Sequence, residues 1–310
     1  MMAVVCRGPG EIALEDRSAP VAGPDQRVVD VLAAALNPTD LIHMLDAELP
    51  SVPGNEGIGI LDGRRVYFER TLAPFGSFAD RALVDQTLPV PLPEEISAGD
   101  ALSVGIAGLA GWLSLEWCAQ LRAGESVLVL GASGPVGWVA VQAARLLGAG
   151  RVVAAARDRS ALEPLLEHGA DAIVELGGDD AAALRDAANG GFDVVIDPLF
   201  GEPLVAALSA SAAGARLVSI GASAGPSATI TRAALHSRRI LTYGNRLTPT
   251  AVKRAAYEKM CRLVLAGELE PAGHELVPLE RFAEAFERQA AHPHRKLVLV
   301  PPASPLHVDR

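Results

Sequence analysis

The chain has few cysteines, few aromatic residues and no long uninterrupted apolar run. Its three cysteines, Cys6, Cys118 and Cys261, lie far apart and form no Cys-x-x-Cys pair, so no disulfide framework is expected. The most apolar windows are too short or too rich in glycine to span a bilayer, and the first ten residues do not look like a secretory signal. We therefore expect a soluble protein of the reducing cytoplasm.

Basic residues are also fewer than acidic residues. The chain has 27 lysines and arginines against 37 acidic residues, and its formal net charge is −10. This balance argues against nucleic acid or an anionic membrane as the main partner. Half of the residues are hydrophobic but only 4% are aromatic, which suits closely packed α/β layers. The length of 310 residues is enough for about two domains.

The pattern of short apolar runs changes along the chain. In the first third, runs such as Val28–Leu36 alternate with turn clusters, which is typical of a β-rich region. Over residues 126–243, buried strands alternate with helical segments, and this order predicts a doubly wound parallel sheet. Helices are expected, among other places, over residues 101–121, 136–147, 160–168, 249–266 and 281–291, and the last strand over 296–300.

A glycine-rich turn joins a buried strand directly to a helix. It reads Val127-Leu-Val-Leu-Gly131-Ala-Ser-Gly134-Pro-Val-Gly137. Gly134 lets the backbone approach a pyrophosphate, Gly137 lets the helix lie against the sheet, and the helix N-terminus offers free N–H groups to phosphates. Because a strand and a helix flank these glycines, the segment predicts a dinucleotide site rather than an ordinary turn.

The end of the next strand distinguishes the two nicotinamide dinucleotides. An acidic residue there binds the ribose 2′-hydroxyl of NAD, whereas an arginine accommodates the 2′-phosphate of NADP. This strand ends at Ala156 and is followed by Arg157-Asp158-Arg159, which favours NADP(H) as the cofactor. Two alternatives stay open: both arginines are simply solvated, or Asp158 faces the ribose or pairs with Arg159.

Several short motifs occur along the chain in a fixed order. They are Asn37-Pro-Thr-Asp40, Pro53-Gly-Asn-Glu56-Gly-Ile-Gly59, Gly76-Ser-Phe-Ala-Asp80, Ala107-Gly-Leu-Ala-Gly-Trp112, the glycine loop, Phe192-Asp-Val-Val-Ile-Asp197, Arg216-Leu-Val-Ser-Ile-Gly221 and Lys296-Leu-Val-Leu. The ordered set resembles the medium-chain dehydrogenase/reductase superfamily, in its zinc-independent, quinone oxidoreductase-like branch.

This resemblance implies an α/β fold with two domains. A GroES-like, β-rich catalytic domain would comprise residues 1–106 and 245–310, and a Rossmann domain with a doubly wound parallel sheet would comprise residues 107–244. It also implies a homodimer joined through an edge strand at Ser237–Tyr243. The cofactor-binding residues would be Gly131, Ser133, Gly134, Pro135, Val136, Gly137, Arg157, Arg159, Asp197, Gly221, Ala222 and Asn245.

The catalytic candidates are Asn37, Asp40, His43 and Tyr67. The resemblance places Asn37 and Asp40 near the nicotinamide, where the amide of Asn37 can donate a hydrogen bond to an oxyanion. His43 is a candidate proton donor because an unperturbed histidine titrates near neutral pH, and Tyr67 is a further candidate. The alternative reading is structural: Asn37-Pro38 forms a turn before a helix, Asp40 caps that helix, and His43 is packed or solvated.

No zinc site is expected. In the zinc-binding branch a cysteine and a histidine occupy the positions that read Asn37 and Asn55 here, and amides are not normal zinc ligands. Glu56 has no evident partner in the sequence. The only closely spaced histidines, in His292-Pro-His294, read as surface residues.

The expected reaction is a metal-free hydride transfer from NADPH to a small-molecule substrate, either a quinone or an α,β-unsaturated carbonyl. The substrate side departs from the family pattern: residues 43–50 contain no tyrosine, and position 110 is alanine. The link from Gly59 to Arg65 is so short that a hairpin normally found there in the family is expected to be deleted. Two alternatives therefore stay open. One is an alcohol dehydrogenase or biosynthetic ene-reductase of the same superfamily, and the other is a dinucleotide-binding protein without turnover.

Overall fold

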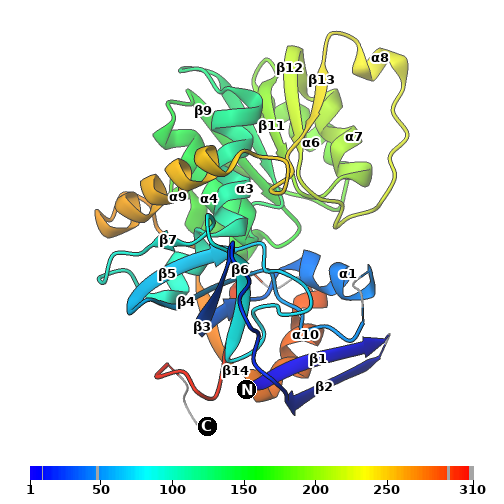
Figure 1. The fold of residues 1–310 in the computed structure, drawn as a ribbon. Coiled ribbons are helices and arrows are strands. Elements are labelled where there is room, and N and C mark those ends of the chain that lie inside the picture. Colours follow the sequence, from blue (N-terminus) through cyan, green and yellow to red (C-terminus); the bar gives the residue numbers. More distant parts are fainter. Residues whose placement is uncertain (9, 47–48, 292–293, 307–310) are drawn as a thin grey trace. The chain divides into compact units, whose positions relative to one another are not determined.

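The computed structural model describes the whole chain except residues 9, 47–48, 292–293 and 307–310. The chain divides into two compact units, one made of Met1–Ile106 with Gly273–Arg310 and the other of Ala107–Ala272. Each unit is built around its own sheet (Figure 1). No helix of the described residues is long and apolar enough to cross a membrane.

The first unit contains a mostly antiparallel sheet of seven strands. Its order is β14-β15-β3-β4-β5-β7, and β6 pairs with β3. The strands are β3 (Gln26–Ala35), β4 (Glu56–Leu61), β5 (Arg64–Glu69), β6 (Arg81–Asp85), β7 (Val90–Pro91), β14 (His274–Pro278) and β15 (Lys296–Val300). Beside it lie an antiparallel pair, β1 (Met2–Gly8) and β2 (Glu11–Asp16), and the helices α1 (Pro38–Asp46), α2 (Ala98–Ser103) and α10 (Phe282–Ala290).

The short link from Gly59 to Arg65, where a hairpin is expected to be deleted, forms a tight turn that joins β4 to β5. Both turn residues, Asp62 and Gly63, have positive φ angles, 50° and 75°. An Asp-Gly pair favours such a two-residue hairpin because glycine, and to a lesser degree aspartate, tolerates positive φ. The pairing continues without a bulge from Leu61 opposite Arg64 to Glu56 opposite Glu69, so the hairpin places Glu56 at the far end from the turn.

The second unit contains six parallel strands in the order β10-β9-β8-β11-β12-β13. They are β8 (Ser126–Leu130), β9 (Arg151–Ala156), β10 (Ala172–Glu175), β11 (Phe192–Asp197), β12 (Ser211–Ser219) and β13 (Arg239–Thr242). The helices are α3 (Ile106–Leu113, whose first residue belongs to the first unit), α4 (Pro135–Leu146), α5 (Arg159–Leu162), α6 (Asp180–Ala188), α7 (Gly201–Ser209), α8 (Arg232–Leu235) and α9 (Thr250–Leu265). This order confirms the predicted doubly wound sheet, with its switch point between β8 and β11.

The core of the second unit explains why its central strands are uniformly apolar. Leu128 and Leu130 of β8 pack in one cluster with Leu184 of α6 and Leu204 of α7. The alternate residues Val127 and Val129 are also fully buried. A strand covered on both faces has no solvated side, so it reads as a continuous hydrophobic run rather than an alternating one.

The single helix predicted over residues 101–121 is wrong. The chain instead forms α2, turns at Val104-Gly105, and continues as α3 and a π-helix over Ser114–Ala119. The reason lies in a carboxylate beside the turn. A Cβ atom on Gly105 would lie 2.5 Å from Oε2 of Glu56, and the N–H of Ile106 donates to that same oxygen at 2.8 Å. Glu56 therefore occupies the N-terminus of α3, where a negative charge is stabilised.

The second boundary between the two units, at residues 272 and 273, also differs from the expected domain boundary at residue 245. Residues 245–272 were expected in the catalytic domain, but their contacts place them in the second unit. Lys259 of α9 forms an ion pair with Glu116 at 3.0 Å, and its Nζ lies 4.6 Å from the ring centroid of Trp112. The backbone of Glu270 exchanges hydrogen bonds with the amide of Gln142 at 2.8 Å.

Candidate functional site

A buried carboxylate, that of Glu56, organises the polar centre of the first unit. Oε1 accepts a hydrogen bond from Nδ2 of Asn37 at 2.9 Å, and Oε2 accepts one from the hydroxyl of Tyr67 at 2.9 Å. The N–H of Ile106 is a third donor, to Oε2. The side chain of Glu56 is fully buried. A carboxylate withdrawn from water requires such partners, because the loss of hydration is otherwise uncompensated.

Lys296 supplies the opposite charge. Its Nζ lies 3.2 Å from Oε1 of Glu56 and donates a short hydrogen bond to the side-chain oxygen of Asn37. The lysine side chain is 3% exposed. The amide of Asn37 thus bridges the cation and the anion: its oxygen accepts from Lys296 and its nitrogen donates to Glu56. Lys296, Glu56, Asn37 and Tyr67 form one closed cluster, called here the Glu56 cluster.

Asp40 joins this cluster through the start of α1. Pro38 is the first helical residue, and the backbone N–H of Asn37 donates to Oδ2 of Asp40 at 2.8 Å. The N–H of Asp40 in turn donates to the carbonyl oxygen of Asn37 at 3.0 Å. Proline is favoured at the first helical position, and a carboxylate three residues after the cap can satisfy the N–H of the cap residue. The structural alternative from the sequence, a turn at Asn37-Pro38 followed by a helix that Asp40 caps, is therefore present.

The environment of Asp40 changes its protonation. The pKa of Asp40 is raised to about 7, mainly by burial and also by the charge of Glu56. The backbone and side-chain hydrogen bonds from Asn37 and the charge of Lys296 act in the opposite direction and only partly offset this rise. Desolvation disfavours the ionised form of a carboxyl group. A carboxyl that is partly protonated at neutral pH can both hold and release a proton, which is the property required of an acid–base group.

The structure describes the side chains of three of the four catalytic candidates. It brings Asn37, Asp40 and Tyr67 together, and all three side chains are buried. His43 lies in α1, but its side chain falls outside the part of the chain that the structure describes. A catalytic role for these residues stays a prediction.

Sequence reasoning missed two members of the cluster. Glu56 was judged to lack partners, yet it accepts from Asn37, Tyr67 and Ile106 and pairs with Lys296. Lys296 was noticed only as the start of an apolar strand. The available signal was the lysine itself, since it begins a strand in which all five residues are buried. A lysine in such a position needs a buried acid.

In the second unit, the glycine loop has the geometry that the sequence predicts. Gly131 has a φ of 59°, and Gly134 is the extended N-cap residue of α4. A Cβ atom on Gly137 would lie 2.5 Å from both Cα of Ala132 and the oxygen of Gly131. The first turn of α4 therefore lies directly against the loop, and its N–H groups, which have no partner within the helix, are available to an anion.

Asp197 holds the neighbouring loop. Its Oδ1 accepts from the N–H groups of Leu199 and Phe200 at 2.9 and 2.8 Å, and its side chain is fully buried. Burial raises the pKa of Asp197. A Cβ atom on Gly131 would lie 3.1 Å from Leu199, so the carboxylate fixes a loop that borders the glycine loop. Direct contact of Asp197 with a cofactor stays a prediction.

The remaining cofactor candidates follow other strands of the same sheet. Gly221 comes after β12, and a Cβ atom on it would lie 3.1 Å from the carbonyl oxygen of Pro198. Ala222 is exposed beside it, and Ser133, Pro135 and Val136 are partly exposed around the start of α4. Asn245 follows β13, and its Oδ1 accepts from the hydroxyl of Tyr243 at 3.0 Å. All of these residues lie at the carboxyl edge of the parallel sheet, where ligands of such sheets bind.

The residues after β9 have distinct surroundings. Oδ1 of Asp158 accepts from the N–H of Ser160 at 3.0 Å and caps α5. Arg159 forms an exposed pair with Glu163 at 3.6 Å. Arg157 is exposed, and among the described residues it has no hydrogen-bond or ion-pair partner. Of the two arginines, Arg157 is therefore the one free to pair with a phosphate.

Several known proteins resemble this chain, some of them over nearly its whole length. A family profile described as zinc-binding dehydrogenase matches residues 135–265. The quinone oxidoreductase of Sus scrofa is 28% identical over 307 residues, covering 90% of each chain. The 2-methylene-furan-3-one reductase of Solanum lycopersicum is 30% identical over 196 residues, or 56% of this chain and 49% of that one.

Among solved structures, the quinone oxidoreductase of Thermus thermophilus, which was also solved in complex with NADPH, matches with a TM-score of 0.79. It is 31% identical, and the match covers 97% of this chain and all of that one. The chain belongs to the medium-chain dehydrogenase/reductase superfamily, in its quinone oxidoreductase-like branch. Its two sheets are those of the GroES-like and Rossmann domains of that superfamily, as predicted.

The raised pKa of Asp40 predicts a specific pH dependence of stability. An unfolded aspartate ionises near pH 4, whereas the folded one keeps its proton until about pH 7. At this group the folded state therefore binds more protons between pH 4 and 7, so the contribution of Asp40 to the free energy of unfolding falls as the pH rises through this range. In Asp40→Asn, which cannot ionise, this contribution is lost, so the change in the free energy of unfolding from pH 4 to pH 7 should be more favourable than in the wild type by about 2 to 4 kcal/mol.

Urea titrations of both proteins from pH 4 to 8 measure the difference. Asp30→Asn is the matched control, because Asp30 lies on β3 with a side chain 64% exposed. Its profile should follow that of the wild type. Parallel profiles for the wild type and Asp40→Asn would show that burial does not hold a proton on Asp40.

Proposed function

We propose that this protein is a zinc-independent oxidoreductase that transfers hydride from NADPH to a quinone or an α,β-unsaturated carbonyl. The observation that carries the proposal is the glycine loop between β8 and α4, on a parallel sheet with the strand order of dinucleotide-binding domains. Membership of the superfamily supports hydride chemistry. The relatives named as quinone oxidoreductases and as a furanone reductase support the two classes of acceptor.

NADP(H) as the cofactor is supported by the residues around the loop. The first turn of α4 offers its N–H groups to the pyrophosphate, and Gly134 leaves room beside them, since the nearest atom to a Cβ there is 3.5 Å away. Arg157 is unpaired among the described residues and is suited to a 2′-phosphate. The NADPH complex of the T. thermophilus relative supports the same cofactor. When bound, NADPH supplies the hydride.

The Glu56 cluster and Asp40 would handle the proton and orient the catalytic groups. The side-chain amide of Asn37, whose nitrogen donates to Glu56 and also interacts with Asp40, is the candidate donor to a developing oxyanion. Asp40, with a pKa of about 7, is the candidate proton source at Oδ1, because Oδ2 already accepts from the N–H of Asn37. Tyr67 and Lys296 fix Glu56 and thereby the orientation of the Asn37 amide.

Independence from zinc is supported by the chemistry of these side chains. The oxygen of the Asn37 amide accepts from Lys296, so its lone pairs face an ammonium group. Within the described residues, no three histidine, cysteine or acidic side chains are grouped as a metal-ligand set. The charge of Glu56 is balanced by Lys296 instead. Zinc analysis of the purified protein by mass spectrometry is the direct control for this part of the proposal.

We propose a cytoplasmic homodimer as the functional form. β13 is the last strand of the parallel sheet, so one of its backbone edges pairs with no other strand of that sheet. An unpaired edge is suited to pairing with the same strand of a second copy. Cytoplasmic location is supported by the scarcity and spacing of the cysteines, of which Cys6 and Cys261 are buried.

An assay of NADPH oxidation with benzoquinones, phenanthrenequinone and simple enones tests the reaction. We expect turnover with at least one of these acceptors. Asp40→Asn should lower kcat about a hundredfold, because loss of a general acid typically costs that much or more. Asp30→Asn should keep wild-type kcat. Binding of NADPH without turnover on any acceptor would favour a dinucleotide-binding protein that is not an enzyme.

Replacement of Arg157 tests the choice of cofactor. In Arg157→Gln, the affinity for NADPH should fall by about tenfold to a hundredfold, because a charge-assisted hydrogen bond to phosphate is lost. The affinity for NADH, which lacks the 2′-phosphate, should not change. Both are measured by titrating the quenching of protein fluorescence. Equal affinity of the wild type for NADH and NADPH would show that the 2′-phosphate is not recognised.

A further inference from the structure

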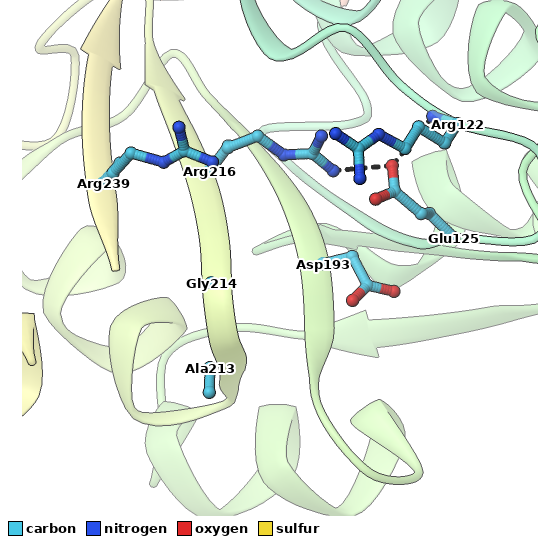
Figure 2. Close-up of a pocket in the computed structure, with 7 residues that line it drawn as sticks. All are labelled: Arg122, Glu125, Asp193, Ala213, Gly214, Arg216 and Arg239. Atoms are coloured by element: carbon cyan, nitrogen blue, oxygen red, sulfur yellow. Dashed lines mark hydrogen bonds and ion pairs between the residues drawn. The ribbon is translucent and has the colours of Figure 1, made fainter. Parts of the chain in front are cut away.

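A pocket lies in the second unit, at the edge of the parallel sheet opposite the glycine loop. Its volume is about 300 Å³, and it is lined by Arg122, Glu125, Asp193, Ala213, Gly214, Arg216 and Arg239 (Figure 2). Arg239 is the first residue of β13 and Asp193 the second of β11, so these are amino ends of strands. The glycine loop follows the carboxyl end of β8. The two sites are therefore separate.

The strand register places two positive charges side by side in this pocket. Arg216 of β12 is paired with Arg239 of β13, and these strands are parallel neighbours. Residues in register on adjacent strands project to the same face with their backbones about 4.8 Å apart. Like charges in such positions repel each other unless an anion lies between or beside them. This register alone therefore favours a negative charge close to Arg216 and Arg239.

The acids in the pocket supply this negative charge only in part. Arg216 donates from Nη2 to Oε2 of Glu125 at 2.6 Å, and the same oxygen accepts the backbone N–H of Arg122 at 2.8 Å. The carboxylate of Asp193 accepts the N–H of Ser126 at 2.9 Å. Three guanidinium groups therefore face two carboxylates that already serve other donors. In a chain with a net charge of −10, this local excess of positive charge stands out as a specific feature.

Arg216 is also incompletely satisfied. Its side chain is only 9% exposed, and its Nη1 makes one long hydrogen bond, 3.4 Å, to the carbonyl oxygen of Gln120. Its buried Nε–H has no hydrogen-bond partner among the described residues. Figure 2 shows the side chain of Arg216 extending from its strand towards Glu125 and Arg122. Arg122 and Arg239 are exposed, and within the described chain their guanidinium groups have no hydrogen-bond or ion-pair partner.

We propose that this pocket binds a small phosphorylated molecule as a second ligand, distinct from the dinucleotide. Arg122 and Arg239 would donate to the phosphate oxygens, since a guanidinium matches a phosphate with two parallel hydrogen bonds. Arg216, whose guanidinium group is held by Glu125, would add its positive charge to the binding site. A volume of about 300 Å³ is at the lower limit of small-molecule pockets, which suits a ligand of one or two phosphate groups with a small organic part. The proposal rests on this geometry and not on the proposed reaction.

Calorimetric titration with inorganic pyrophosphate, in the presence of excess NADPH, tests the proposal. NADPH occupies the glycine loop, which is the competing site for pyrophosphate. We expect the wild type to bind pyrophosphate and Arg122→Gln/Arg239→Gln to bind it at least about tenfold more weakly, because two charge-assisted contacts are lost. Arg232→Gln, which alters an exposed arginine of α8 outside the pocket, should bind as the wild type does.

Three results would overturn the proposal. They are absence of pyrophosphate binding to the wild type, equal binding by the double variant, and complete displacement of pyrophosphate by NADPH in titrations at rising NADPH concentration. Both replaced arginines are exposed and unpaired among the described residues, so the double variant should unfold at the wild-type temperature and keep the wild-type elution volume. If NADPH itself fails to bind, the cofactor proposal is wrong. The proposal of a phosphate-binding pocket is then still tested by comparing pyrophosphate binding to the double variant and to Arg232→Gln.

Discussion

The ion pair between Lys296 and Glu56 is the interaction on which the polar centre of the first unit depends. It joins the first residue of β15 to the first residue of β4. Asn37, two residues after the end of β3, bridges the two charges. Tyr67 of β5 and the start of α3 complete the set of donors. Removing the cation would leave a fully buried carboxylate without an opposite charge, which is far more costly than losing a surface pair. The cluster fixes the orientation of the Asn37 amide and the electrostatic environment of Asp40.

The parts of the protein that could be predicted from the sequence are those with local causes. The glycine loop is legible because the strand, the turn and the helix are contiguous, and Gly131 and Gly137 are required by a positive φ and by close packing. The strand order of the second unit follows from regular alternation of strands and helices. The β4–β5 hairpin also has a local cause in its Asp-Gly turn, although the short link from Gly59 to Arg65 led us to expect that a hairpin was deleted there. In the glycine loop and the hairpin, fewer than a dozen neighbouring residues determine the geometry.

The parts that could not be predicted depend on contacts between distant segments. Lys296 and Asn37 are separated by 259 positions, and nothing local to either indicates the other. The break between α2 and α3 has the same origin, since Gly105 makes room for Glu56. The pKa of Asp40 follows from burial, which only the assembled unit produces. The proposed phosphate pocket arises from the register of β12 and β13, which cannot be predicted from the sequence.

A double-mutant cycle on Glu56 and Lys296 tests the central claim most directly. The free energies of unfolding of Glu56→Gln, Lys296→Met and the double variant give the coupling energy between the two side chains. We predict a coupling of about 2 to 3 kcal/mol, because each single change leaves its partner buried and unpaired. The exposed pair Glu116–Lys259, with side chains 38% and 41% exposed, should give less than about 1 kcal/mol with the same substitutions. Additive effects at positions 56 and 296, or a coupling no larger than that of the exposed pair, would contradict the claim.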